Sequence, residues 1–256
     1  RVLIVVPTQG KRLEHLNSCL KSIVSQSVPA EVVIVSPIDR EVQTIAEKFD
    51  ARIFVDPGSQ TKAINAGVKF ALQNSSFEFV NWLGDDDLLE PDSLKTTTAA
   101  LDANPAATVT YGACRYIDER DQELWVSGAG KWAPRLLGWG PDLIPQPGML
   151  VRMSDWQSVG GVDESYRFAF DLDLLLRLRK LGPLVDTGTI VSSFRWHADS
   201  LTVGDRTTNL QESERAKRAA LSPNTRKMAW LWERPVRGAT RIAAWEVSRR
   251  AGKKRT

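Results

Sequence analysis

Short apolar runs alternate with helical patterns along the first half of the chain, in units of about thirty residues. Buried strands are predicted at residues 1–6, 31–35, 52–55, 77–83 and 108–117. Apolar residues recur at helical spacing between them. Such alternation requires parallel strands joined by right-handed crossovers. The pattern therefore predicts an α/β fold, with a Rossmann-like, mostly parallel central sheet flanked by helices.

Length and charge fit this fold and add one feature. The 256 residues suit one large α/β domain with an extension, and 25% charged residues argue against general disorder. Residues 215–256 hold thirteen Lys or Arg against two Asp or Glu, a net +11, whereas the remainder is −8 with 21 basic and 29 acidic side chains. An acidic body with a basic tail predicts separate roles for the two parts.

The sequence also indicates a compartment. Cys19 and Cys114 lie far apart and form no metal-ligand or CxxC spacing. The chain runs directly into a strand-like segment without a secretory signal, and no apolar run is long enough to cross a bilayer. We expect a cytoplasmic protein.

The second half is less regular. Residues 118–148 are rich in Gly, Pro and Trp and predict an irregular covering segment. A strand at 149–152, a helix at 172–181 and a strand at 189–196 are expected beyond it.

Ligands of such sheets lie outside the carboxyl ends of the strands. Three loops there contain Pro7 and Thr8, residues 36–39, and residues 85–87. Their convergence predicts a site on the first half of the chain.

Three adjacent carboxylates, Asp85, Asp86 and Asp87, directly follow a predicted strand. Because like charges repel, a packed fold tolerates such a triplet only beside a cation or strong hydrogen-bond donors. Asp85 and Asp87 can point the same way and offer oxygen ligands to a divalent ion that also binds a diphosphate. A solvated acidic turn explains the triplet equally well from these residues alone.

Two further segments place a titratable group at the end of an element. Asp171 begins a predicted helix, where it either caps the helix or accepts a proton from a hydroxyl; taken alone, the cap is favoured. A structural role is expected for Asp173. His197 follows a strand and could complete an Asp/His metal site suited to Mn²⁺, although a structural histidine is the simpler interpretation. His15 is expected at the surface.

Together these segments resemble a known family. From about residue 2 to 202 the chain is similar to glycosyltransferase family 2, inverting enzymes with the GT-A fold that use nucleotide sugars. The resemblance rests on SQTKAINAGVKFA (59–71), VNWLGDDDLLEPDSL (80–94), VTYGACRYIDERDQEL (109–124) and IPQPGMLVRMSDWQSVGGVDESYRFAFDLDLLLRL (144–178). These match the family's nucleotide loop, DXD motif, middle strand and acceptor-side segment, in that order.

The resemblance implies a GT-A catalytic domain at 1–205, with a nucleotide-sugar-binding half (1–117) and an acceptor-binding half (118–205). It implies that Asp171 is the catalytic base and that Asp87 and His197 bind Mn²⁺ or Mg²⁺. The nucleotide sugar would contact Pro7, Thr8, Gln60, Lys62, Asp85 and Asp86. Gln146, Pro147 and Gly148 would shape the pocket for the transferred sugar and the acceptor.

One departure concerns the base. Many relatives end the second strand with an Asp that binds uracil, whereas this chain has Val35-Ser36-Pro37-Ile38-Asp39. Ser36 can form one bond and Asp39 can reach in from the loop, so UDP, dTDP and GDP sugars all stay open.

The resemblance implies transfer to a glycan or lipid-linked acceptor in bacterial cell-surface polysaccharide synthesis. Residues 206–256 are basic and Trp-rich, and we expect them to form an amphipathic helical extension. It either binds an anionic membrane, on the cytoplasmic face of the inner membrane, or packs on the catalytic domain or in a homodimer.

Three other functions fit the sequence less well. A sugar-phosphate nucleotidylyltransferase needs a Gly-rich, basic loop after the first strand, which PTQGKR (7–12) matches poorly. A non-catalytic nucleotide-sugar or carbohydrate-binding protein needs no carboxylates on both the nucleotide and the acceptor sides. Nucleic-acid binding is not expected, because the body is acidic and no reading module is recognisable.

Overall fold

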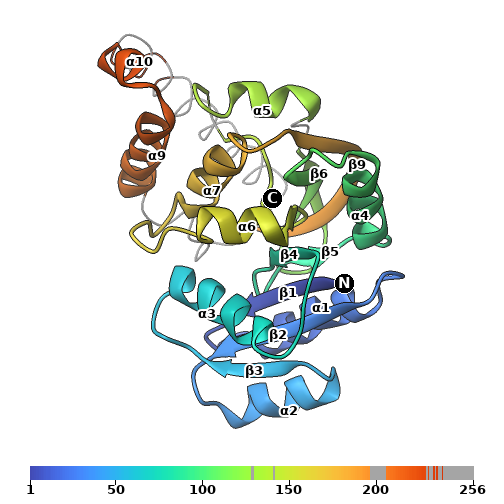
Figure 1. Cartoon of the computed structure of the whole chain (residues 1–256). Coiled ribbons are helices and arrows are strands. Elements are labelled where there is room, and N and C mark those ends of the chain that lie inside the picture. The colour runs from blue at the N-terminus through green and yellow to red at the C-terminus, as the bar shows by residue number, and fades with distance from the viewer. Residues whose placement is uncertain are drawn as a thin grey trace.

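The computed structural model describes residues 1–127, 130–140, 142–196 and 206–228, and the single residues 230, 233, 235 and 238. Nine strands in this part form one sheet in the order β3-β2-β1-β4-β8-β6-β9-β5, with β7 paired to β6. Figure 1 shows the sheet running through the molecule, with helices on both sides. The strands are β1 (Val2–Pro7), β2 (Ala30–Ser36), β3 (Arg52–Val55), β4 (Phe79–Trp82), β5 (Leu88–Leu89), β6 (Val109–Ile117), β7 (Glu123–Val126), β8 (Leu150–Arg152) and β9 (Leu184–Arg195).

The first half of the sheet is parallel and the second half is mixed. β1 pairs in parallel with β2 and β4, and β2 with β3. β8 is antiparallel to both β4 and β6, while β6 and β9 are parallel. The predicted α/β fold is thus confirmed, and the antiparallel pairs lie in the part of the chain where the strand–helix alternation fades.

Helices cover both faces of the parallel strands. Alternate residues of β1 enter two separate cores: Leu3 and Val5 pack with α3, α6 and α7, whereas Val2, Ile4 and Val6 pack with α1, α2 and α4. A strand buried on both faces requires an unbroken apolar run, which β1 has. The helices are α1 (Leu13–Val24), α2 (Arg40–Lys48), α3 (Gln60–Leu72), α4 (Ser93–Ala103), α5 (Ala133–Leu136), α6 (Met153–Val159), α7 (Phe170–Leu178), α9 (Arg206–Ala220), α10 (Pro223–Lys227) and the 3₁₀ helix η1 (Gly130–Trp132).

The segment predicted as an irregular cover is partly regular. It contains β7, η1 and α5, and Tyr116 of β6 stacks on Trp125 of β7 with ring centroids 4.4 Å apart. The short β7 escapes sequence analysis because a four-residue strand carries little periodicity.

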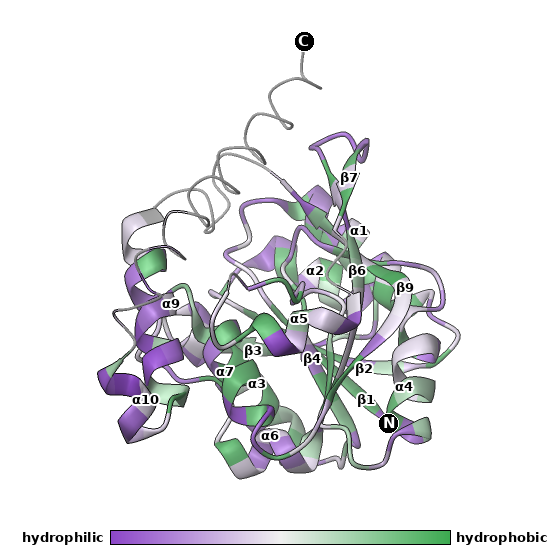
Figure 2. Cartoon of the chain, turned by 90° about the horizontal axis from the view of Figure 1, so that it is seen from above, coloured by the Kyte–Doolittle hydropathy of each residue, from purple (hydrophilic) through white to green (hydrophobic). Residues whose placement is uncertain are grey.

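The basic extension begins with α9, which packs beside α7 (Figure 1). Viewed from above in Figure 2, α9 and α10 carry many hydrophilic residues, and the strands between the covering helices are largely hydrophobic. Within the described residues, no helix combines the length and apolarity needed to cross a bilayer.

Gly67 tests the packing of α3 on the sheet. A Cβ at this position would lie 2.6 Å from Val5 Cγ1 and 2.9 Å from Val35 Cγ2, both buried. We expect Gly67→Ala to lower the free energy of unfolding by about 1–3 kcal/mol through overpacking. The measurement is urea unfolding, with the exposed Lys69→Ala on the same helix as control. Equal stability of both variants would contradict this packing.

Candidate functional site

A cavity of about 440 Å³ opens at the carboxyl ends of β1 and β4 and continues to the start of α7. Its wall contains all three carboxylates of the acidic triplet and also Asp171, although these lie more than eighty positions apart in sequence. The residues at its two ends therefore face one shared space.

The acidic triplet is held by neighbours that offset its charge. Arg12 at the start of α1 pairs with Asp86, at 2.8 Å between Nη1 and Oδ2. The Thr8 hydroxyl donates a short hydrogen bond to Asp85. The backbone N–H of Arg195 donates to Oδ1 of Asp87 at 3.1 Å. These contacts supply the cation and donors that three adjacent carboxylates require.

Strand pairing explains the position of Arg195. β5 runs antiparallel to β9 with Leu88 opposite Ser193, so Arg195 falls beside the triplet. Its buried side chain donates to the backbone oxygens of Asp86 and Asp118, each at 3.0 Å, and pairs with Asp121 at 2.6 Å. Arg195 thus ties the acidic turn to the β6–β7 connection.

Gly84 leaves room for the Asp86 and Asp87 carboxylates to fold back over the turn that carries the triplet. A Cβ there would lie 2.8 Å from Oδ2 of Asp87 and 3.2 Å from Oδ1 of Asp86. Any larger residue would push these carboxylates away, so the glycine is needed for their present orientation.

Burial and mutual repulsion disfavour the ionised forms of the triplet carboxylates. Burial raises the pKa of Asp85 despite the Thr8 hydrogen bond, and it raises the pKa of Asp87 well above its usual value, with Asp86 adding to the effect. A bound cation would relieve this cost. No three His, Cys, Asp or Glu side chains group as a complete metal site in the part of the chain described. Two cavity carboxylates suit a hard divalent ion that takes its other ligands from a substrate diphosphate and water.

Gln60, the first residue of α3, lines the same end of the cavity. Its buried Oε1 has no hydrogen-bond partner among the described residues. An unpaired buried amide oxygen is costly and is expected to find a partner in a ligand. Lys62, two residues further on, is exposed and lies outside the cavity lining.

Pro7 lines the cavity directly, whereas the buried Thr8 acts through Asp85. Two other predicted nucleotide contacts do not reach the cavity wall. Asp39 is the N-cap of α2 and accepts hydrogen bonds from the N–H groups of Glu41 and Val42 at 2.8 and 3.0 Å. The Ser36 hydroxyl donates to the Pro37 carbonyl at 2.8 Å.

Gln146 and Pro147 line the cavity between its two ends. The Gln146 side chain donates to the Trp82 carbonyl at 2.7 Å, and the buried Asn81 donates to the Pro147 carbonyl at 2.9 Å. Gly148 lies outside the lining and packs on β9, where a Cβ would approach Val191 Cγ2 to 2.4 Å. This segment is therefore fixed to the end of β4 and to the middle of β9.

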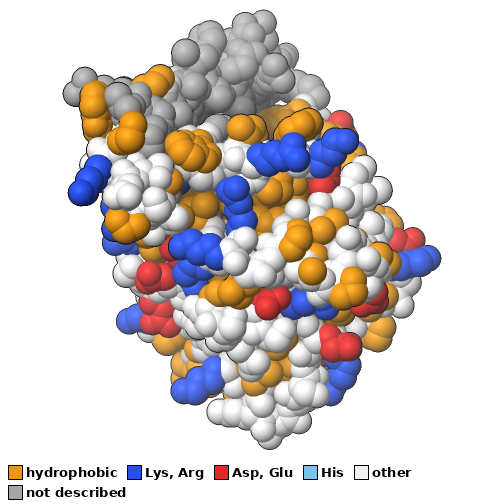
Figure 3. Space-filling view, turned by 45° about the horizontal axis from the view of Figure 1, so that its top comes forward, with side chains coloured by type: hydrophobic (Ala, Val, Ile, Leu, Met, Phe, Trp, Pro, Cys, Tyr) orange, Lys and Arg blue, Asp and Glu red, His pale blue; other side chains and the backbone are white. Residues whose placement is uncertain are grey.

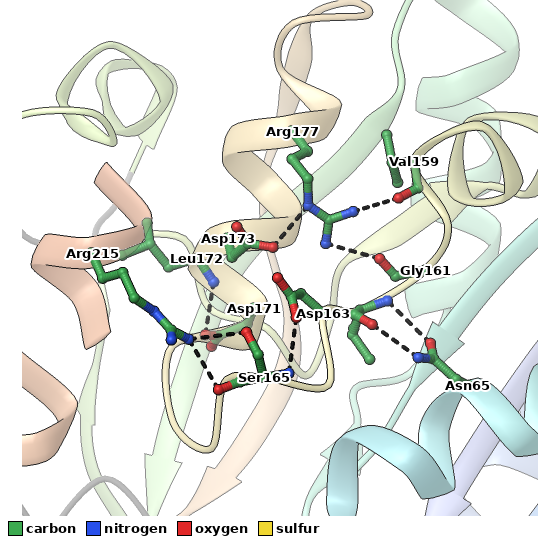
Figure 4. Close-up of polar contacts among 11 residues, drawn as sticks. Asn65, Val159, Gly161, Asp163, Ser165, Asp171, Leu172, Asp173, Arg177 and Arg215 are labelled. Atoms are coloured by element: carbon green, nitrogen blue, oxygen red, sulfur yellow. Dashed lines mark hydrogen bonds and ion pairs between the residues drawn. The ribbon is translucent and has the colours of Figure 1, made fainter. Parts of the chain in front are cut away.

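Asp171 projects from the first turn of α7 into the cavity. Figure 4 shows the loop before it tied down by Arg177, which donates to the carbonyls of Val159 and Gly161 at 2.7 and 2.8 Å and pairs with Asp173 at 2.8 Å. Asp173 thus has the structural role expected for it. Burial raises the pKa of Asp171 to about 6.

The interpretation of Asp171 as the helix cap is wrong. Ala169 is the N-cap residue, whereas Asp171 is the second residue of the helix and its carboxylate accepts from the adjacent Leu172 N–H at 2.8 Å. The free N–H groups before α7 bond instead to Glu212 of α9. Its carboxylate accepts from Arg167, Phe168 and Ala169 at 2.7 to 3.1 Å.

Sequence reasoning missed this role of Glu212, because a cap from a distant helix leaves no local pattern. Burial would raise the pKa of Glu212, but the three N–H donors outweigh it and hold the pKa below its usual range. Arg215, one turn further along α9, donates to the carbonyl and hydroxyl of Ser165 at 3.0 and 3.2 Å (Figure 4). Asn209 and Ser213 of α9 line the cavity.

Asp142 was also missed, since it lies in a Gly- and Pro-rich stretch without a motif. It lines the cavity together with Asp171. Burial and the nearby charge of Asp171 raise the pKa of Asp142 to about 7. The two carboxyls interact, so they titrate as a pair.

Of the two histidines, His15 alone lies within the described residues. His197 lies outside the residues that the structure describes. His15 is half-buried rather than at the surface, and burial lowers its pKa, with a further contribution from Arg195.

Known proteins share parts of this sequence and its fold. A sequence model described as Glycosyl transferase family 2 matches residues 3–155. The match includes β1 to β8 and the acidic triplet, but not Asp171 or α9. A search of curated protein sequences gives no significant match.

Solved structures share the fold. Residues 1–349 of S. aureus TarS in complex with UDP-GlcNAc are 16% identical, with a TM-score of 0.65 over 90% of this chain and 70% of that one. The Pyrobaculum calidifontis mannosyltransferase PcManGT, in complex with GDP-Man and Mn²⁺, is 18% identical, with a TM-score of 0.62 over 96% and 75% of the two chains. Identities this low show the fold alone.

Glu212 can be tested for its structural contribution. Glu212→Ala leaves three N–H groups before α7 without their acceptor, and we expect a loss of about 2 kcal/mol in the free energy of unfolding at neutral pH. Because the folded pKa of Glu212 is depressed, this loss shrinks as pH falls below the ordinary Glu value of about 4.3. Chemical unfolding at several pH values measures it, with the exposed Gln211→Ala as control. A loss that grows in acid would contradict this role.

Proposed function

Because this chain belongs to glycosyl transferase family 2, whose members use nucleotide-sugar donors, we propose that it transfers a sugar to an acceptor hydroxyl with inversion and with the help of a divalent cation. The observation that carries the proposal is the cavity shared by the acidic triplet and Asp171. Family membership favours a transferase over a nucleotidylyltransferase or a non-catalytic binding protein.

The acidic end of the cavity is proposed to hold the nucleotide diphosphate. Asp87 and Asp85 would bind Mn²⁺ or Mg²⁺, with His197 as a further ligand, and this ion would neutralise charge on the departing diphosphate. Arg12 and Arg195 keep the triplet in place, and the unpaired Gln60 amide oxygen offers a hydrogen-bond acceptor to the nucleotide. UDP, dTDP and GDP sugars all fit this chemistry.

At the other end, Asp171 is proposed to act as general base. It takes the proton from the acceptor hydroxyl while the hydroxyl oxygen forms a bond to the anomeric carbon and the bond from that carbon to the diphosphate oxygen breaks. Attack from the side opposite the leaving group inverts the anomeric configuration. A base with a pKa of about 6 is deprotonated at neutral pH and retains basicity, which suits this role.

The acceptor is proposed to be a glycan or a lipid-linked sugar in bacterial cell-surface polysaccharide synthesis, approached from the cytoplasmic side of the membrane. Asn209 and Ser213 of α9 contribute polar groups to the acceptor end of the cavity. Gln146 and Pro147, fixed to the end of β4, would contact the transferred sugar between the two sites.

Two substitutions test the roles of the two ends of the cavity separately. Asp171→Asn should lower the rate of nucleoside diphosphate release from the donor by about 100- to 10,000-fold and leave nucleotide affinity nearly intact. Asp87→Ala should weaken Mn²⁺-dependent nucleotide binding itself. The assays are a donor screen for diphosphate release and calorimetric titration with nucleoside diphosphates.

The exposed Asp102→Asn on α4 is the matched control and should behave as the unaltered protein. Near-normal turnover of Asp171→Asn would exclude it as the base. If the unaltered protein releases nucleoside diphosphate from none of the nucleotide sugars tested, the proposed function is overturned.

The carboxyl pair predicts a pH effect. Turnover should rise as the pair loses protons between about pH 6 and 7. Asp142→Asn leaves Asp171 as the one titrating carboxyl of the pair, so the rising limb should be a single step near the Asp171 pKa of about 6 and should no longer extend to pH 7. The pH profile of diphosphate release measures this change, and an unchanged limb would show that Asp142 does not influence the base.

A further inference from the structure

Four large apolar side chains are exposed on one short segment beside the cavity mouth. We name Trp132, Leu136, Trp139 and Leu143 the α5 patch, because they lie in α5 or close to it in sequence. Their exposed fractions are 59%, 45%, 44% and 38%. Single exposed apolar residues are common on protein surfaces, but a cluster on one segment marks a surface that contacts something else.

The segment that carries the patch is anchored to the body of the protein. Ala133 and Leu137 are buried in the core that also contains α7. The Tyr111 hydroxyl donates to the Gly130 carbonyl at 3.0 Å, and the Lys217 ammonium donates to the Gly140 carbonyl at 2.6 Å. The exposed side chains are therefore presented by a fixed backbone.

The charge around the patch indicates what it contacts. Residues 130–143 contain Lys131 and Arg135 and a single acidic residue, Asp142, which lines the cavity. The Arg135 guanidinium lies 4.5 Å from the centre of the Trp132 ring. Figure 3, which brings the top of Figure 1 forward, shows basic and apolar side chains interspersed over that end of the molecule. Trp combined with Lys and Arg is typical of surfaces that enter the interface of an anionic bilayer.

We propose that the α5 patch docks on an anionic lipid bilayer and holds the cavity mouth against it. The chain runs from the patch directly into the cavity wall, because Asp142, Ile144 and Pro145 follow within a few residues and line the cavity with Asp171. A lipid-linked acceptor would reach the base from the membrane without leaving it. Docking is independent of the chemistry, whereas the delivery of acceptor rests on the proposed function.

The test is flotation of the full chain with vesicles of phosphatidylcholine, alone or with phosphatidylglycerol. The unaltered protein should float with the anionic vesicles only, and less at high salt. Trp132→Ala with Trp139→Ala should weaken binding at least tenfold. Lys131→Gln with Arg135→Gln should weaken it by about fivefold for each charge.

The matched control is Val55→Ala with Arg40→Gln. These residues are also exposed, and β3 and α2 lie at the end of the molecule opposite α5 in Figure 1. This variant should bind as the unaltered protein does. Thermal unfolding checks that all variants fold.

Three results would overturn the proposal. The unaltered protein could fail to bind anionic vesicles. The patch variants could bind as tightly as the control, which would assign membrane binding to another region such as the basic extension. Sedimentation could show the patch variants changing a dimer into a monomer, which would make the patch an interface between copies of this chain.

Failure of the proposed function is distinguishable from these results. None of the substituted patch residues lines the cavity. Release of nucleoside diphosphate without membranes should therefore be unchanged in the patch variants. A protein that docks but releases no diphosphate from any donor would keep the docking surface and lose the proposed function.

Discussion

Repulsion among three adjacent carboxylates at the end of β4 is the constraint on which the site depends. Three contacts offset this repulsion. Arg12 forms an ion pair with Asp86, the Thr8 hydroxyl donates a hydrogen bond to Asp85, and the Arg195 backbone N–H donates one to Asp87. These partners come from three separate strand or helix ends, so the triplet keeps its arrangement only in the assembled sheet. Burial leaves Asp85 and Asp87 with raised pKa values, which a bound divalent cation would lower again.

The second half of the molecule completes a cavity that the first half begins. β9 supplies Arg195 to the acidic turn, and α7 supplies Asp171 across the cavity. Helix α9 then closes over the loop before α7, and its Glu212 takes the place of a local helix cap. The start of α7, which carries Asp171, therefore depends on a helix that lies beyond the family match at residues 3–155.

Patterns local in sequence predicted the parallel strands, and they singled out the acidic triplet and Asp171, which line one cavity. They could not predict contacts that depend on the assembled sheet. Asp39 shows this, because its place after β2 suggested a nucleotide contact and the structure makes it the cap of α2. Glu212 and Asp142 act on α7 from distant elements without a motif of their own. Only the register between β5 and β9 explains why Arg195 meets the triplet.

The most direct test of this account is a crystal structure of the chain with a nucleoside diphosphate and Mn²⁺, the metal located by its anomalous scattering. The account predicts Mn²⁺ bonded to Asp87, and the diphosphate lying in the cavity between the acidic triplet and Asp171. A nucleotide bound elsewhere, or a metal held by residues outside this cavity, would contradict it.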